Sequence, residues 1–262
     1  MFYNICIIFS FNIAKAIIPL TESSNFFTMK LKYIQMVLCF LATSVVLAQQ
    51  INQFDSKGLR HGIWRKNFHE TKELRYEGEF NHGKEIGVFK YYTLNNKKSV
   101  LSATKTFNPN NDIAEVKFFS STGKLISEGK MNGKLYMGKW VYYHNKTNAI
   151  MSTETYNNQG NLEGEKLVYY DNGQIAERVN YVNGKIQGVS RWYSETGVVL
   201  KEFHYVNDEL HGEAKYYNDE GQLLAEGSYK HDSKDGIWKY YKDGKLEEEK
   251  DFTKKSKNPY KQ

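Results

Sequence analysis

The sequence predicts an all-β fold, an elongated single-layer solenoid of about eight stacked antiparallel β-hairpins. The first observation behind this prediction is a repeated motif, a glycine followed four and five residues later by two aromatic residues. The second is that turn sequences interrupt the chain about every 12 residues, which leaves no room for amphipathic helices of normal length. The third is an aromatic content of 15%, which is too high for a disordered chain.

The motif recurs along most of the chain and defines the repeat. From Gly188 to Gly212, and again from Gly212 to Gly236, the distance is 24 residues. A degraded copy covers residues 112–119, so that eight copies are expected between residues 55 and 252. The other copies read GVFKYY from Gly87, GKWVYY from Gly138, GVSRWY from Gly188, GEAKYY from Gly212 and GIWKYY from Gly236, with looser versions from Gly62 and Gly164.

Each copy also carries two turn signals. A glycine at the end of a short polar stretch supplies the positive φ that tight turns need. A strand, a turn, a second strand and a second turn therefore make up each copy. The first kind of turn reads DNG at 171–173, ETG at 195–197, DEG at 219–221 and KDG at 242–244; the second reads HGK at 82–84 and NGK at 132–134 and 183–185.

The alternation of side chains along a strand assigns two faces to the predicted sheet. In GIWKYY, Trp238 and Tyr240 share one face, whereas Ile237, Lys239 and Tyr241 share the other. One face is therefore aromatic and aliphatic, and the other mixes Lys, Glu and Tyr. This pattern is typical of a half-buried antiparallel sheet.

A strand register follows if the turn at 218–221 consists of four residues and the next turn sets Tyr229 opposite Gly236. The same rule predicts two opposite-charge pairs in other copies, and it predicts one like-charge pair, which counts against it. The pairs expected around residues 212–240 are Tyr217–Gln222, Tyr216–Leu223, Gly212–Gly227, Tyr229–Gly236, Gly227–Trp238 and Glu226–Lys239. Those expected elsewhere are Glu202–Lys215, Glu77–Lys90 and Arg178–Arg191.

The N-terminal region resembles a signal peptide for export. Lys30 and Lys32 precede an apolar stretch that ends in Val-Leu-Ala at 46–48. A membrane-spanning helix is the alternative, but it needs about 20 apolar residues. We therefore expect a periplasmic, cell-envelope or secreted protein. The predicted organisation is an upstream extension at 1–28, a signal peptide at 29–48, a short linker at 49–54, the repeat domain at 55–252 and a basic tail at 253–262.

The repeats resemble the variant MORN repeat family of bacteria. The stretches that carry the resemblance are NGKIQGVSRWY, NDELHGEAKYYNDEGQLLAEGSY and DGIWKYYKDGKLEEE. The resemblance is strongest between Gly138 and Glu249. It implies a single-layer sheet of stacked hairpins that acts as a non-enzymatic scaffold or binding surface. Many bacterial relatives are described as antitoxin-like, a description that is assigned on the basis of sequence similarity.

No motif for catalysis or metal binding stands out in the sequence. The seven histidines are scattered, without an HExxH motif or a cysteine partner, and His61 and His211 occupy one repeat position. We therefore expect no enzyme activity, no cofactor and no metal. The formal charge of +6 is spread along the chain, so that no nucleic-acid partner is expected either.

The aromatic face holds the candidate binding residues. One interpretation places its tryptophans in the core of the sheet, and the other makes the face a binding stripe, because a single layer has nothing of its own to cover it. The partner expected is another protein or a second copy of the chain. The alternatives are an antitoxin or immunity-type inhibitor of a toxin, and a binder of envelope glycans or lipids. The candidate residues are Trp140, Tyr142, Trp192, Tyr216, Trp238 and Tyr240.

Overall fold

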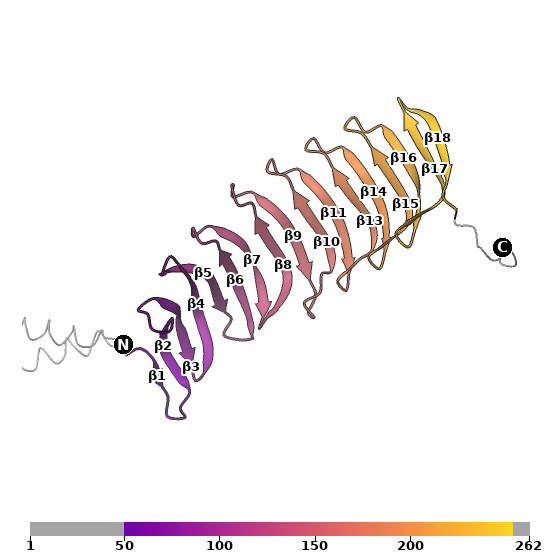
Figure 1. The fold of residues 1–262 in the computed structure, drawn as a ribbon. Helices are drawn as coiled ribbons and strands as arrows, with labels where there is room; N and C mark the ends of the chain where they lie inside the picture. Colours follow the sequence, from indigo (N-terminus) through magenta and orange to yellow (C-terminus); the bar gives the residue numbers. More distant parts are fainter. Residues whose placement is uncertain (1–49, 254–262) are drawn as a thin grey trace, which may run out of the picture. The chain divides into compact units, whose positions relative to one another are not determined.

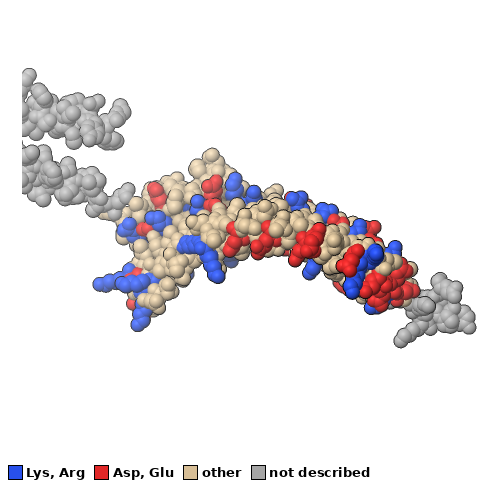
Figure 2. Space-filling view, turned by 90° about the horizontal axis from the view of Figure 1, so that it is seen from above, with Lys and Arg blue, Asp and Glu red and all other residues tan. Residues whose placement is uncertain are grey.

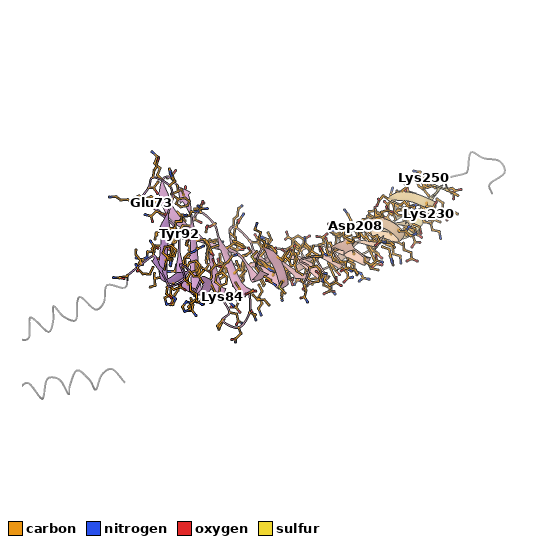
Figure 3. The ribbon with its side chains drawn as sticks, turned by 90° about the horizontal axis from the view of Figure 1, so that it is seen from below. Glu73, Lys84, Tyr92, Asp208, Lys230 and Lys250 are labelled. Carbon is orange, nitrogen blue, oxygen red and sulfur yellow. The ribbon has the colours of Figure 1, made fainter. Side chains whose placement is uncertain are left out.

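A computed structural model describes residues 50–253 of the chain, and these residues form one open antiparallel sheet (Figure 1). Each strand pairs with the next strand along the chain, except that the short β12 and the following β13 both pair with β11. Figure 3 shows the sheet as a single layer with side chains on both faces. The predicted extension, the signal peptide and nearly all of the basic tail lie outside the described residues. Within residues 50–253, no helix is long and apolar enough to cross a membrane.

The strands follow one another at short intervals. Their bounds are β1 Gln53–Phe54, β2 Arg60–Asn67, β3 Leu74–Asn81, β4 Lys84–Asn95, β5 Lys98–Phe107, β6 Ile113–Phe119, β7 Leu125–Asn132, β8 Leu135–Tyr143, β9 Ile150–Tyr156, β10 Gly164–Tyr169, β11 Ile175–Val182, β12 Lys185–Ile186, β13 Gly188–Tyr193, β14 Val199–Val206, β15 Glu209–Tyr217, β16 Leu223–Lys230, β17 Ser233–Lys242 and β18 Lys245–Asp251.

The repeats are hairpins, as the sequence predicts. Without the two-residue strands β1 and β12, sixteen strands remain, and they form eight hairpins. The short β12 precedes β13 by one residue and pairs with the same neighbour, β11. One difference concerns residues 49–54, which the sequence assigns to a linker. Gln53 and Phe54 of that segment form β1 and pair with the start of β2.

Two-residue turns join many of the strands, four of them at one end of the strands and two at the other. Both turn residues have positive φ, which gives the turn the same twist as the flanking strands. Asn, Asp and Gly tolerate this conformation best, which explains the NG and DG signals in the sequence. The turns with positive φ at both residues are His82–Gly83, Asn96–Lys97, Asn183–Gly184, Asn207–Asp208, His231–Asp232 and Asp243–Gly244.

The loop between β15 and β16 is longer than the sequence-based register assumes. The Asn218 side chain accepts hydrogen bonds from the backbone N–H groups of Glu220 (3.1 Å) and Gln222 (2.8 Å). The loop therefore includes Gln222, and a bulge after the first pair adds a further residue, Leu224. The expected pairs of this hairpin are wrong for these two reasons. The observed pairs are Tyr217–Leu223, Tyr216–Ala225, Ala214–Gly227 and Gly212–Tyr229.

The register between hairpins agrees better with the prediction. Glu226–Lys239, Glu202–Lys215 and Glu77–Lys90 are confirmed as directly opposite pairs. The pair Tyr229–Gly236 is wrong, because a bulge at the start of β17 sets Tyr229 opposite Lys234. These pairs belong to one continuous line of residues, which we call the charge row. It consists of Arg65, Glu77, Lys90, Thr104, Lys117, Glu128, Val141, Thr153, Leu167, Arg178, Arg191, Glu202, Lys215, Glu226, Lys239 and Glu249.

The like-charge pair Arg178–Arg191 is also present in the sheet. Each guanidinium has a carboxylate of its own on the strand beyond. Arg191 Nε lies 2.6 Å from Glu202 Oε2, and Arg178 Nη1 lies 3.1 Å from Glu165 Oε1. Because a carboxylate neutralises each arginine, the two like charges can lie opposite each other without the repulsion that they would otherwise cause.

Glycine is required under the large rings of the opposite face. The indole of Trp238 lies flat across Gly227, and a Cβ atom at Gly227 would overlap the ring. Gly129 stands in the same relation to Trp140, and Gly78 to Phe89. A strand glycine here makes room for an aromatic neighbour, because the ring needs the space that a side chain would fill.

The contact between Gly227 and Trp238 gives a stability prediction. Gly227→Ala forces the indole away from the strand, and overpacking of this kind costs about 1–3 kcal/mol. Ser228→Ala, one residue along and with a side chain on the other face, should change the free energy of unfolding by less than about 0.5 kcal/mol. Urea unfolding of both variants measures the difference. Equal stability of the two variants would contradict the close packing.

Candidate binding surface

The aromatic face has a central row that forms the core of the sheet. It lies on the face opposite the charge row and contributes most of the fully buried side chains, including Trp140 and Trp238 with 0% exposure. Large and small residues alternate along much of it, so that each ring covers a small neighbour. The row consists of Trp64, Gly78, Phe89, Lys105, Val116, Gly129, Trp140, Glu154, Lys166, Val179, Ser190, Phe203, Ala214, Gly227, Trp238 and Lys250.

Trp238 is covered on all sides. Its Nε1 donates a hydrogen bond to the Ser228 carbonyl oxygen at 3.0 Å, which satisfies the only polar group of the indole. The Lys234 ammonium lies 4.0 Å from the centre of the ring, and Tyr229 meets it edge-on at 5.1 Å. Lys234 thus covers the tryptophan as a second layer would. Its aliphatic chain covers apolar surface, and its ammonium group makes a cation–π contact with the indole.

Trp140 repeats this arrangement in another copy. Its Nε1 donates to the Lys130 carbonyl oxygen at 3.0 Å, and the ring of Tyr136 stacks on the indole at 4.0 Å. Two of the six candidate binding residues, Trp140 and Trp238, therefore lie in the core and present no surface to a partner. For them the structure favours the packing interpretation.

The other four candidates lie in a second line on the same face, which we call the tyrosine row. Tyr142, Trp192, Tyr216 and Tyr240 are all half-buried. Trp192 does not occupy the position of the other tryptophans: Ser190 stands there, and Trp192 takes the place of the first tyrosine of the motif. The row consists of Lys66, Tyr76, Tyr91, Ala103, Phe118, Ser127, Tyr142, Ser152, Val168, Glu177, Trp192, Lys201, Tyr216, Ala225, Tyr240 and Glu248.

Hydrogen bonds hold the hydroxyl groups of this row in place. The hydroxyls of Tyr216 and Tyr229 lie 3.1 Å apart, and Lys234 Nζ donates to the hydroxyl of Tyr240 at 2.9 Å. Burial raises the pKa of Tyr142 to about 12, and it raises the pKa of Tyr216 as well. The rings are therefore neutral, fixed and only partly covered, which suits them to contact with a partner.

A polar group interrupts the aromatic face near its middle, and the sequence analysis missed it. Glu154 and Lys166 form an ion pair at 3.1 Å, with only 12% and 28% of their side chains exposed. The hydroxyl of Tyr156 donates to Glu154 at 2.6 Å, and the carboxylate helps to raise the pKa of Lys166. The signal was present in GEKLVYY, where Lys166 stands at the tryptophan position of the motif.

On the opposite face, the second tyrosine of the motif binds a glutamate of the charge row. The hydroxyls donate to Glu77, Glu128 and Glu226 at 2.9, 2.5 and 2.7 Å, from Tyr92, Tyr143 and Tyr241 respectively. The hydrogen bond raises the pKa of Tyr143 to about 12 and lowers the pKa of Glu128. Each glutamate precedes its tyrosine by 15 residues, a spacing that a search for paired Glu and Tyr could have found.

Two histidines in the two-residue turns pair with carboxylates. His82 Nδ1 lies 2.6 Å from Asp55, and His231 Nδ1 lies 2.6 Å from Glu209. Within residues 50–253, no group of three or more His, Cys, Asp or Glu side chains is arranged to hold a metal ion. These pairs fix neighbouring turns to one another.

A comparison with known families matches the C-terminal half of the sheet. Residues 162–183, 186–207, 210–231 and 234–254 match the MORN repeat variant. Each matched stretch corresponds to one hairpin between β10 and β18. The hairpins from β2 to β9 continue the same rows beyond the matched residues. No curated protein matches the chain.

The burial of Trp238 predicts a loss of stability on its removal. Trp238→Ala should cost about 3–5 kcal/mol, the usual cost of truncating a buried aromatic side chain. Because each hairpin contacts only its neighbours, β17 and β18 should exchange their amide hydrogens first while the earlier strands stay protected. Glu226→Ala, on the other face, should cost about 1 kcal/mol. Uniform loss of protection along the sheet would contradict this expectation.

The bond between Tyr143 and Glu128 predicts a loss of stability in alkali. The pKa of Tyr143 is raised to about 12 in the fold, above the usual value of 10.0, so its contribution is complete below pH 10 and is lost as the pH rises to 12. Tyr143→Phe should therefore lose less stability than the parent between pH 9 and 11. Glu128→Gln should act in the same direction, because it removes the main cause of the shift. Urea midpoints at the two pH values test both, and an unchanged alkaline loss would refute the assignment.

Proposed function

We propose that this chain, whose residues 162–254 are four tandem MORN repeat variants, is a non-catalytic scaffold that binds another protein through its aromatic face. The observation that carries the proposal is the half-buried tyrosine row, which no other element of residues 50–253 covers. A row of large aromatic side chains that stays open to solvent often marks a site of contact with a partner.

The composition of the row supports a protein partner. Tyr and Trp are enriched in protein interfaces because they combine a large apolar area with a polar end and lose little conformational freedom on binding. Trp192, Tyr216 and Tyr240 occupy the row on alternate strands. The buried central row beside them holds the same strands in place, so that the surface is organised before a partner arrives.

The charge row on the other face is a less suitable surface. Its carboxylates already bind partners within the sheet: Glu77 contacts Arg65, Lys90 and Tyr92, and Glu202 contacts Arg191. A partner would have to compete with these contacts and desolvate the charges. Residues 29–48 support export of the chain, and we place the interaction in the envelope or outside the cell.

Photo-crosslinking tests the choice of face. With p-benzoylphenylalanine in place of Tyr216 or Tyr240, we expect one protein of the host envelope to be crosslinked strongly. The same group in place of Val189 or Ile237, which are exposed on the opposite face, should give at least tenfold less product. Mass spectrometry of the purified adducts identifies the protein. Crosslinking that is confined to positions 189 and 237 would reverse the assignment.

A further inference from the structure

The two ends of the sheet differ in whether the outer edge of the last strand is covered. At the N-terminal end, residues 51–54 cover the outer edge of β2, and we call them the clasp. The backbone N–H of Asn52 donates to the Ile63 carbonyl at 2.8 Å, and the Asn52 side chain accepts from the Arg65 N–H at 2.8 Å. Asn52 has a φ of 60°, and Phe54 packs edge-on against Trp64 at 5.0 Å. The clasp thus substitutes for a neighbouring strand.

At the C-terminal end of the sheet, no strand within residues 50–253 pairs with the outer edge of β18. All seven of its residues are exposed, and in the described part of the chain only β17 pairs with it. An open edge leaves backbone donors and acceptors ready to pair with another strand. Figure 2 shows acidic side chains gathered at this end, on the right, and basic side chains projecting at the opposite end.

The strand count makes the two ends geometrically compatible. Sixteen full-length strands run alternately up and down from β2 to β18, so β18 is antiparallel to β2. A β2 strand from a second copy in the same orientation would therefore meet β18 as an antiparallel neighbour. The sheet would continue from one molecule into the next without a change of pattern.

The rows supply the register of this contact. If each row continues across the junction, Glu249 lies opposite Arg65 of the second copy, Glu248 lies opposite Lys66, and Lys250 lies opposite the ring of Trp64. The first two are opposite-charge pairs, and the third places a cation against an aromatic ring. All three contacts are favourable in one register.

Contacts between like ends each contain a like-charge pair. Two β18 edges paired about Glu249 would set Glu249 against Glu249, although Glu248 would then lie opposite Lys250; two β2 edges paired about Arg65 would set Arg65 against Arg65, although Lys66 would then lie opposite Trp64. Only the contact between unlike ends has no like-charge pair and continues all three rows, which favours the directional pairing.

We propose that β18 of one copy pairs with β2 of a second copy, head to tail, when the clasp leaves β2. The clasp and the incoming β18 compete for the backbone groups of Ile63 and Arg65, so that only one of them occupies the edge. The clasp therefore sets the concentration at which the chains join. This inference is independent of the partner proposed for the aromatic face.

Weakening of the clasp tests the proposal. In the full chain, Asn52→Ala with Phe54→Ala removes the side-chain hydrogen bond and the contact with Trp64. We expect self-association at a concentration at least about tenfold lower than in the parent, the factor that about 1.4 kcal/mol gives. Sedimentation velocity over a range of concentrations measures it, and circular dichroism checks that the sheet is retained. A variant that is folded but associates no more readily than the parent would overturn the proposal.

Charge reversal in the same clasp-weakened background tests the register. Glu248→Lys with Glu249→Lys makes both ends basic, and Arg65→Glu with Lys66→Glu makes both ends acidic, so each variant alone should remain monomeric. A mixture of the two variants should associate again, because each β18 then meets a β2 of opposite charge. Association of either variant alone to the extent of the unreversed protein would refute this edge as the interface. Failure of the mixture to associate would refute the register.

Discussion

The indole of Trp238 over Gly227 is the contact on which this kind of sheet depends. A sheet of one layer has no second layer to bury its apolar side chains, so it can remove them from water only by laying them across its own backbone. An indole needs a strand position without a side chain beneath it, and a cation or ring above it. Gly227 and Lys234 meet these two needs for Trp238, and Gly129 and Tyr136 meet them for Trp140.

The division of the two faces follows from this contact. Because the central row is sealed by its neighbours, the aromatic side chains beside it are exposed enough to be used for contact without weakening the core. The opposite face stabilises the sheet by different means, with charges and tyrosine hydroxyls that bind one another. Glu154 and Lys166 are the exception, since they place an ion pair in the middle of the central row, where most of the other positions have apolar or small residues. That pair marks the middle of the sheet as chemically distinct from its ends.

Most of the fold could be predicted from the sequence because the repeat is short and its turns use Gly, Asn and Asp. The faces followed from the alternation of residues. The pair Glu226–Lys239 was predicted correctly although the expected pair Tyr229–Gly236 is wrong, because the bulge at the start of β17 compensates for the shorter turn. The register inside the hairpins could not be predicted, because it depends on how the Asn218 side chain closes its loop and on the bulge at Leu224. The candidate surface was only partly predictable. The motif places Trp238 and Tyr240 on the same face, so the sequence does not distinguish them. The packing around each residue shows that Trp238 is buried and Tyr240 is half-buried.

The uniformity of the hairpins bears on how a chain of this kind can change its length. Residues 212–235 begin at one motif glycine and end just before the next, and they contribute Lys215 and Glu226 to the charge row. A tandem duplication of these 24 residues would insert two strands and add one Lys–Glu pair to the charge row. Both terminal strands of the sheet would stay as they are. Copy number can therefore drift by whole hairpins under little selective cost. Gain or loss of a single strand, by contrast, would reverse the direction of everything that follows it.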